Sequence, residues 1–297
     1  MKEAFSVSGF FRWNRPGNDR EEVFETFARS GTRFLAVDAE TTLSLPEKPE
    51  KMKELCRKAA KANLVFRDAH APWGPGRDLN EITNEEIFSL HEKVLHILGE
   101  NGIRTCTYHI GASCIYTTKD WYGKEDLYRS IALKALERLL KTAEQYQLTL
   151  CVENCFEPST TAQEAMNLVK HFDSPWIGLC LDCGHANLME PMEGREVTKM
   201  VSYIQRAWEK SAVPLFTPGI AELMSPEIVT VHVHDNDGLN DKHAVPDEYG
   251  TIDWKRLKGV LRNSPRLLSL QSEAGDSAEN PLGKIEHISK TLRNLWQ

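Results

Sequence analysis

Short apolar runs alternate with amphipathic stretches along the whole chain. Eight runs have the length and composition of β-strands, and a stretch with helical periodicity follows each of them. The predicted strands are residues 4–8, 34–38, 64–69, 105–109, 148–153, 177–182, 228–234 and 267–271. The predicted helices are residues 20–30, 51–62, 84–101, 124–146, 162–171, 196–208, 254–261 and 284–295. Strands that alternate with helices in this way form a parallel sheet with helical crossovers.

Eight strand and helix pairs in a chain of 297 residues predict an α/β fold, the (β/α)8 TIM barrel. A doubly wound sheet usually has fewer strands and a glycine-rich phosphate-binding turn after the first one. Neither GxGxxG nor GxxxxGK occurs in the sequence, and no linker or low-complexity segment divides it. We therefore predict that residues 1–297 form a single TIM-barrel domain.

The stretch that begins at Val229, VTVHVHDNDGLNDKHAVPDE, contains the densest group of potential metal ligands. Valines alternate with polar residues, a period of two that places His232 and His234 on one face of a strand. A loop rich in Asn, Asp and Gly follows and carries Asp241 and His243. Imidazole and carboxylate together suit zinc or manganese. This stretch predicts half of a metal site.

Further potential ligands stand at the ends of other predicted strands. Six of the ten histidines end or follow a strand, and three acids do the same, which are Glu153, Asp182 and Glu273. In a TIM barrel these positions meet at the carboxyl face, where the active site lies. A carboxylate at such a place is costly unless it is paired or bound to metal. Their convergence predicts a divalent cation, bound also by His70, His109 and His185.

Several of these residues have a simpler explanation as well. His70 can be a capping or packing histidine, and His109 can be a core histidine. Asp182 and His185 form a DxxH pair just past a strand, a more specific arrangement for binding metal or substrate. Asp241 and His243 can be solvated loop residues.

Two further assignments concern residues beside the predicted metal. His232 is expected to bind the ion, with Asp235 three residues further on, while His234 supports the site or contacts substrate. Trp73 and Trp13 lie in loops at the predicted mouth. A tryptophan there can stack on a sugar face or a base, or it can pack on the barrel rim.

Composition narrows the classes of binding partner and the cellular compartment that we expect. The formal net charge of -7 disfavours a nucleic acid, because phosphate backbones are bound mainly by Lys and Arg. The seven cysteines, an odd number, fit reduced thiols better than a disulfide framework, with Cys106, Cys151 and Cys180 in apolar core runs. Without a signal peptide or an apolar run long enough to cross a bilayer, we expect a soluble, cytoplasmic protein with no membrane partner. The sequence leaves open whether the chain forms a homo-oligomer.

The strand-end ligands resemble those of the xylose-isomerase-like TIM barrel superfamily, and the similarity spans essentially the whole chain. That superfamily includes sugar isomerases and epimerases, inosose dehydratase-type lyases and abasic-site endonucleases. The resemblance to the sugar epimerases implies that one metal ion is held by Glu153, Asp182, His232 and Glu273. It also implies that His185 touches the substrate.

The sequence is also similar to the abasic-site endonucleases, which hold three zinc ions. The resemblance implies a counterpart for each of their ligands, which are His70, His109, Glu153, Asp182, His185, His232, Asp241, His243 and Glu273. The segment GLCLDCGH resembles their GLCxDTCH, although Cys183 and Gly184 replace Thr and Cys. The segments APWGPGRDLN after His70 and HVHDNDGLNDKH from His232 depart from the nuclease pattern and favour the sugar branch.

The resemblance thus implies a metal-dependent isomerase or epimerase, or a related lyase, acting on a small carbohydrate such as a sugar, keto-sugar or polyol. Glu153 and Glu273 are expected to exchange a proton with the substrate, which His185, Trp73 and His234 would bind. The expected cofactor is Mn²⁺, Zn²⁺, Co²⁺ or Mg²⁺. Two alternatives remain: a zinc-dependent abasic-site endonuclease, and a barrel that binds a sugar or serves as an accessory subunit without turnover.

Overall fold

The computed structural model describes residues 6–111, 123–208, 216–246, 250–274 and 281–296. Within them, parallel strands close into a barrel in which each strand pairs with its neighbours in sequence and β1 pairs with β8. The strands are β1 (Ser6–Phe11), β2 (Phe34–Val37), β3 (Val65–His70), β4 (Thr105–His109), β5 (Thr149–Glu153), β6 (Ile177–Asp182), β7 (Ile228–Val233) and β8 (Ser269–Ser272). The predicted TIM barrel is confirmed.

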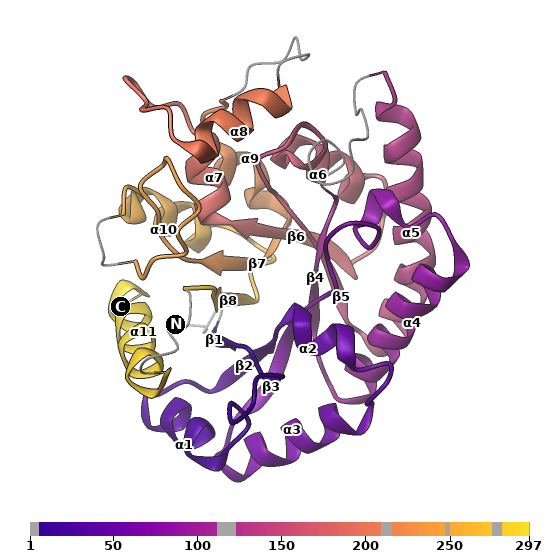
Figure 1. Cartoon of the computed structure of the whole chain (residues 1–297), viewed down its shortest axis with the longest axis vertical. Coiled ribbons are helices and arrows are strands. Elements are labelled where there is room, and N and C mark those ends of the chain that lie inside the picture. Colours follow the sequence, from indigo (N-terminus) through magenta and orange to yellow (C-terminus); the bar gives the residue numbers. More distant parts are fainter. Residues whose placement is uncertain (1–5, 112–122, 209–215, 247–249, 275–280, 297) are drawn as a thin grey trace.

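The helices surround the strands (Figure 1). The predicted ones are all present, with ends that differ by a few residues: α1 (Glu21–Arg29), α3 (Glu50–Lys61), α4 (Glu85–Glu100), α5 (Glu125–Tyr146), α6 (Ala162–Lys170), α8 (Lys199–Trp208), α10 (Trp254–Arg262) and α11 (Pro281–Trp296). The periodicity did not predict the short helices α2 (Ala39–Ser44), α7 (Cys183–Met189) and α9 (Ile220–Met224), nor the 3-10 turns η1 (Leu79–Glu81), η2 (Pro158–Thr160) and η3 (Ser225–Glu227).

The first strand lies further along the chain than predicted. Ala4 and Phe5 of the predicted strand are outside the described residues, and β1 continues to Phe11. Its backbone register with β2 pairs Phe10 with Ala36 and Phe11 with Val37. Pairing with a neighbouring strand therefore extends β1 through the Ser-Gly interruption that weakens its apolar pattern.

Trp13 is part of the core and does not lie at the mouth. Its side chain is fully buried, stacks on Phe24 at 5.1 Å between ring centroids and meets the Phe66 ring edge-on at 5.0 Å. Its indole Nε1 donates a hydrogen bond of 2.8 Å to the Ala36 carbonyl, which satisfies the polar group of a buried tryptophan. The packing alternative is thus the one observed, and Trp13 is not available for stacking on a ligand.

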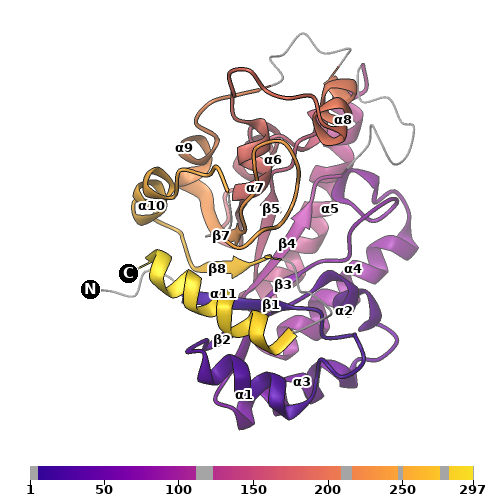
Figure 2. The same ribbon diagram turned by 60° about the vertical axis from the view of Figure 1, so that its left-hand side comes forward.

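The first and last helices lie side by side and complete the outer ring (Figure 2). Arg29 of α1 pairs with Glu286 of α11 at 3.2 Å, and the Thr32 and Ser289 hydroxyls lie 3.1 Å apart. The ion pair is exposed and contributes little by itself. Burial of Ile285 and Leu292 of α11 holds this helix against the barrel.

The described cysteines are unpaired thiols, and Cys106, Cys151 and Cys180 are buried as predicted. Cys114 lies outside the described residues. Among the helices that the structure describes, none combines the length and the apolar character needed to cross a membrane.

Candidate functional site

Six consecutive strands each bring one potential metal ligand to the carboxyl face of the barrel. Four of these residues end a strand, one is the penultimate residue of β7, and one directly follows β8. In strand order they are His70, His109, Glu153, Asp182, His232 and Glu273. Closure of the barrel therefore brings together side chains that are far apart in sequence, as predicted.

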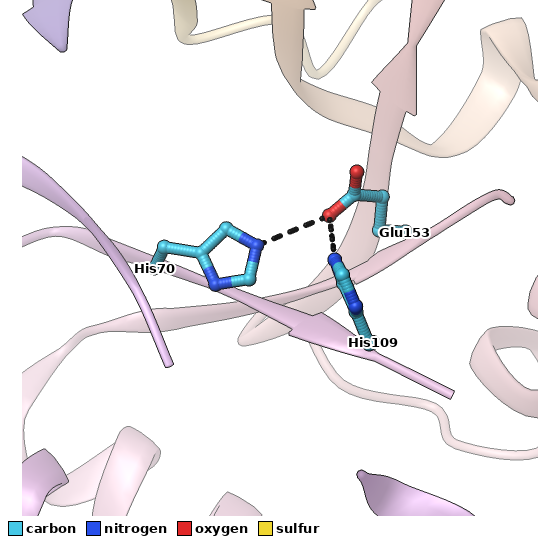
Figure 3. A group of neighbouring side chains, drawn as sticks. All are labelled: His70, His109 and Glu153. Atoms are coloured by element: carbon cyan, nitrogen blue, oxygen red, sulfur yellow. Dashed lines mark ion pairs between the residues drawn. The ribbon is translucent and has the colours of Figure 1, made fainter. Parts of the chain in front are cut away.

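Glu153 faces His70 and His109, and one oxygen of its carboxylate lies near both imidazoles (Figure 3). Its Oε2 is 3.2 Å from Nε2 of His109 and 3.4 Å from Nε2 of His70, and its Oε1 is 3.2 Å from Nδ1 of His232. The side chain is only 1% exposed, yet Oε2 accepts no hydrogen bond from the described residues. A buried carboxylate oxygen faced by imidazole nitrogens is the arrangement that a cation would satisfy.

A second set of ligands shares Glu153 and surrounds His232. Nδ1 of His232 is 3.3 Å from Oε1 of Glu273 and 3.8 Å from Oδ2 of Asp182. Asp182 also caps α7, because its Oδ1 accepts a hydrogen bond of 2.7 Å from the backbone N–H of His185. The DxxH spacing is therefore that of a helix N-cap and its third residue, which fixes the two side chains relative to each other.

A third set comes from α7 and from the loop after β7. Oδ2 of Asp241 is 3.6 Å from Nε2 of His185, and its Oδ1 is 3.4 Å from Nε2 of His243. The loop is held against the end of β7 by two backbone hydrogen bonds of 2.8 Å between Asp235 and Ala244. These bonds place the two loop ligands at the site, although nothing in the sequence of the loop predicts the pairing.

Three histidines at the site are held by the same kind of hydrogen bond. Nδ1 donates to a backbone carbonyl in each: His70 to Ala71 at 2.8 Å, His185 to Asn154 at 3.0 Å, and His243 to Glu273 at 3.1 Å. A carbonyl can only accept, so Nδ1 carries the hydrogen, and Nε2 faces the carboxylates. Metal-binding histidines are typically oriented by such a bond from the other ring nitrogen. The donor set therefore fits divalent metal ions.

Carboxylates and imidazoles at the site shift each other's pKa. Burial alone would raise the pKa of Glu153, but His232 and His109 outweigh it and hold this pKa well below its usual range. Burial would likewise lower the pKa of His243, but the hydrogen bond with Asp241 and nearby carboxylate charge raise it to about 9. Without metal, ionised acids therefore face protonated imidazoles, and an incoming cation would replace protons.

His234 adjoins the metal-ligand set, and with His243 and Glu273 it forms another group that could hold a metal ion. It is fully buried, and its Nε2 lies 3.0 Å from Oδ2 of Asp182. Its ring stacks on that of His243 at 3.8 Å between centroids. His234 is not among the described residues that line the cavity at this face. This placement favours a role in orienting Asp182 over the predicted contact with substrate.

Asp235 points away from the metal-ligand set and organises the loop that precedes α10. Its carboxylate accepts hydrogen bonds from Nε1 of Trp254 at 2.6 Å, from the N–H of Asn236 at 2.8 Å and from the N–H of Ile252 at 3.4 Å. Gly250 lies so close that an added Cβ would be 1.8 Å from the carboxylate carbon. The HDNDG and IDW segments are therefore coupled through this side chain.

We expect Asp235→Asn to lower the free energy of unfolding by about 1–3 kcal/mol, because an amide cannot accept all three hydrogen bonds. Chemical denaturation measures this change. Bound metal, determined by elemental analysis, should equal that of the wild type, since the backbone of Asp235 still pairs with Ala244. Loss of metal in this variant would show that the side chain contributes to the site.

A cavity of about 510 Å³ opens above the ligands, a size that suits a small molecule. Trp73 lines it, is 47% exposed, and lies 5.1 Å from the His109 ring. Glu157 and Tyr203 also line it, and sequence analysis did not identify them. Glu157 is the N-cap of η2, beyond the end of β5, and Tyr203 is on α8. Neither residue is therefore at a position that strand periodicity marks.

The fold and the site define an α/β barrel with a polar cavity at the carboxyl ends of its strands, lined by side chains that could bind a cation. A family model for the xylose isomerase-like TIM barrel matches residues 23–294, and the chain belongs to this family.

Solved structures share the fold. A D-psicose 3-epimerase in the presence of D-fructose is 14% identical, with a TM-score of 0.66, covering 98% of this chain and 96% of that one. The 3-keto-D-glucoside 4-epimerase from E. coli is 15% identical, with a TM-score of 0.66 and 98% of both chains covered. A xylose isomerase-like TIM barrel protein from Mycobacterium smegmatis, in complex with magnesium, is 12% identical, with a TM-score of 0.64 and 100% of both covered. No curated protein sequence matches the chain.

Proposed function

We propose that the protein is a metal-dependent enzyme that isomerises or epimerises a sugar, keto-sugar or polyol. One observation carries this proposal: Glu153 and Glu273 both line the cavity, and both lie within 3.3 Å of the same nitrogen of His232. Two carboxylates that can share one ion can also reach one substrate from different sides. The sugar epimerases among the structures that share the fold support the same reaction class.

Glu153, Asp182, His232 and Glu273 would hold the ion that this reaction needs. When bound there, a divalent ion would polarise a carbonyl oxygen and a neighbouring hydroxyl of the substrate. Oxygen and nitrogen ligands of this kind accept Mn²⁺, Zn²⁺, Co²⁺ or Mg²⁺. The magnesium complex of the related M. smegmatis barrel supports a hard divalent ion.

The protein's own residues would move the proton and orient the substrate. One of Glu153 and Glu273 would take a proton from the carbon beside the carbonyl, and the other would return a proton on the opposite face. Nε2 of His185, which lies at the cavity, would donate to a substrate oxygen. The exposed ring of Trp73 would pack against the apolar face of the sugar.

Solvent exchange tests this function. In ²H₂O, the manganese-loaded protein should incorporate deuterium into at least one of D-fructose, D-psicose and D-tagatose, as measured by mass spectrometry. A product that has lost water would identify the related elimination. Binding of these sugars without any exchange would contradict catalysis and favour a sugar-binding barrel.

A second function, hydrolysis of a phosphodiester in abasic DNA, is favoured by the number of ligand groups. His70, His109 and Glu153 form one group that could hold a metal ion, and His185, Asp241 and His243 form another. Clustered zinc ions suit hydrolysis, in which water is the nucleophile. Elemental analysis near three zinc ions per chain, with chelator-sensitive cleavage of an abasic-site oligonucleotide, would establish this function over the first. The small cavity volume favours the sugar.

A further inference from the structure

A thiol lies beside the proposed metal site. Cys155 comes two residues after Glu153, the last residue of β5, and both side chains line the cavity. One ligand atom each of Glu153, Cys155 and His185 lies within 4.8 Å of the others, so these residues form a group that could hold a metal ion. The three ligand sets at the site otherwise contain only nitrogen and oxygen. This group adds sulfur, a donor that sequence analysis did not identify.

The protein fixes the thiol and the imidazole relative to each other. The side chain of Asn154 bridges to the end of β6: its Oδ1 accepts a hydrogen bond of 2.9 Å from the Asp182 N–H, and its Nδ2 donates one of 3.2 Å to the Asp182 carbonyl. The Asn154 carbonyl accepts from Nδ1 of His185 at 3.0 Å. The N–H of Cys155 donates to the Thr160 carbonyl at 2.7 Å. The backbone around the thiol is therefore held before any ion binds, as a preorganised ligand requires.

Glu153 gives an independent indication that a cation belongs in this group. Its side chain is 1% exposed, and Oε2 accepts no hydrogen bond from any described residue. A buried carboxylate oxygen without a donor destabilises the fold unless a ligand satisfies it. Thiolate, carboxylate and imidazole are together the ligands that zinc accepts in proteins.

A second thiol is a rival for the same role. Cys180 forms a comparable group with Glu153 and His232. Its side chain is fully buried, and it is not among the described residues that line the cavity. An ion that enters through the cavity therefore meets Cys155 first.

We propose that Cys155, Glu153 and His185 form a further metal position, which takes a thiophilic divalent ion such as Zn²⁺ or Co²⁺. It shares Glu153 with the ion of the proposed enzyme. On binding, the sulfur–hydrogen bond breaks, a metal–sulfur bond forms, and the proton passes to solvent. An ion there would also take the imidazole of His185 from the substrate. The inference itself does not require the sugar reaction.

The thiol determines which ions this position selects. Thiolate is a soft ligand that favours zinc over magnesium and manganese, which prefer oxygen. Mg²⁺ or Mn²⁺ is therefore expected only at the neighbouring position, whose ligands are oxygen and nitrogen atoms. Loss of a residue that merely supports a ligand already costs about 10–100-fold in metal affinity, so loss of the sulfur should weaken zinc binding at this position at least about 10-fold.

Absorption spectroscopy of the metal-free full chain, titrated with Co²⁺, tests the proposal. A cobalt–thiolate bond gives a sulfur-to-metal charge-transfer band in the near ultraviolet, which oxygen and nitrogen ligands do not give. The wild type should show this band, and Cys155→Ser should lose it. Equilibrium dialysis of Cys155→Ser with Zn²⁺ should show one class of ion bound at least about 10-fold more weakly than in the wild type.

Cys56→Ser is the matched control, and it should keep both the band and the zinc affinity. Cys56 is also a half-buried thiol, but it is on α3 and is not among the described residues that line the cavity. Cys155→Ala is a second variant in case the serine disturbs folding, and it should also lose the band.

X-ray absorption at the zinc edge of the wild type gives a measurement that needs no variant. It should show a sulfur neighbour at about 2.3 Å from zinc. Absence of sulfur there would overturn the proposal, as would absence of the band from a protein that contains cobalt by elemental analysis. A band that persists in Cys155→Ser and disappears in Cys180→Ser would also overturn it, because the deeper thiol would then be the ligand.

This inference and the proposed function can fail separately. Deuterium exchange by the manganese-loaded protein, without any cobalt–sulfur band, would reject the inference alone. A band that depends on Cys155, with sugars that bind but do not exchange, would reject the isomerase alone.

Discussion

Glu153→Gln is expected to empty the metal site and to lower the rate of deuterium exchange by about 10³-fold. The residue lies within 3.4 Å of nitrogens from His70, His109 and His232, so this one carboxylate faces three imidazoles. Glutamine keeps the volume and removes the charge. The variant therefore loses an anionic ligand and a proton carrier in one change.

Elemental analysis and the exchange rate should be measured on the same preparation of Glu153→Gln. Glu144→Gln, which changes the same chemical group on the outer surface of α5, is the matched control and should retain metal and activity. A Glu153→Gln protein that keeps both would refute both roles. Full metal content with lost exchange would assign proton transfer alone to this carboxylate.

Removal of metal by a chelator is expected to lower the melting temperature by about 10 °C. An ion present at 1,000 times its dissociation constant stabilises the folded state by about 4 kcal/mol. For a chain of this size, about 1 kcal/mol corresponds to a shift of a few degrees. Differential scanning calorimetry with MnCl₂ or with EDTA measures the difference, which should be much smaller in Glu153→Gln.

The size of this metal effect should depend on pH. The pKa of His243 in the metal-free fold is raised from 6.5 to about 9, so its contribution to stability is fully present below about 6.5 and is lost as the pH rises through about 9. Protons also compete with metal for the same nitrogen. Metal should therefore raise the melting temperature more at pH 9 than at pH 6.5. A smaller effect at pH 9 would contradict the assignment of protonated imidazoles to the metal-free site.

Much of the fold and the ligand set could be predicted because both depend on short-range pattern. Period-two and helical periodicity located the strands and the main helices. His109 and Glu153 could be placed near each other, although they are on different strands, because barrel geometry brings all strand ends to one face. Their separation of 3.2 Å confirms this convergence.

The remaining features depend on tertiary contacts that leave no local pattern. Trp13 looks like a loop residue in sequence, but a pocket of aromatic rings from α1 and β3 buries it. Helix α7 is too short for periodicity to reveal and begins because Asp182 caps it. Glu157 and Tyr203 are 46 residues apart, and only the packing of α8 over the loop after β5 brings them together.

The position of Glu153 between neighbouring ligand groups has a consequence for how the site fills. One oxygen faces His70 and His109, and the other faces His232. An ion bound to one oxygen would withdraw electron density from the carboxylate and fix its orientation. Both effects would change how the other oxygen binds a second ion. Occupancy of the two positions would then be interdependent, and a titration with metal would report cooperativity in place of independent sites.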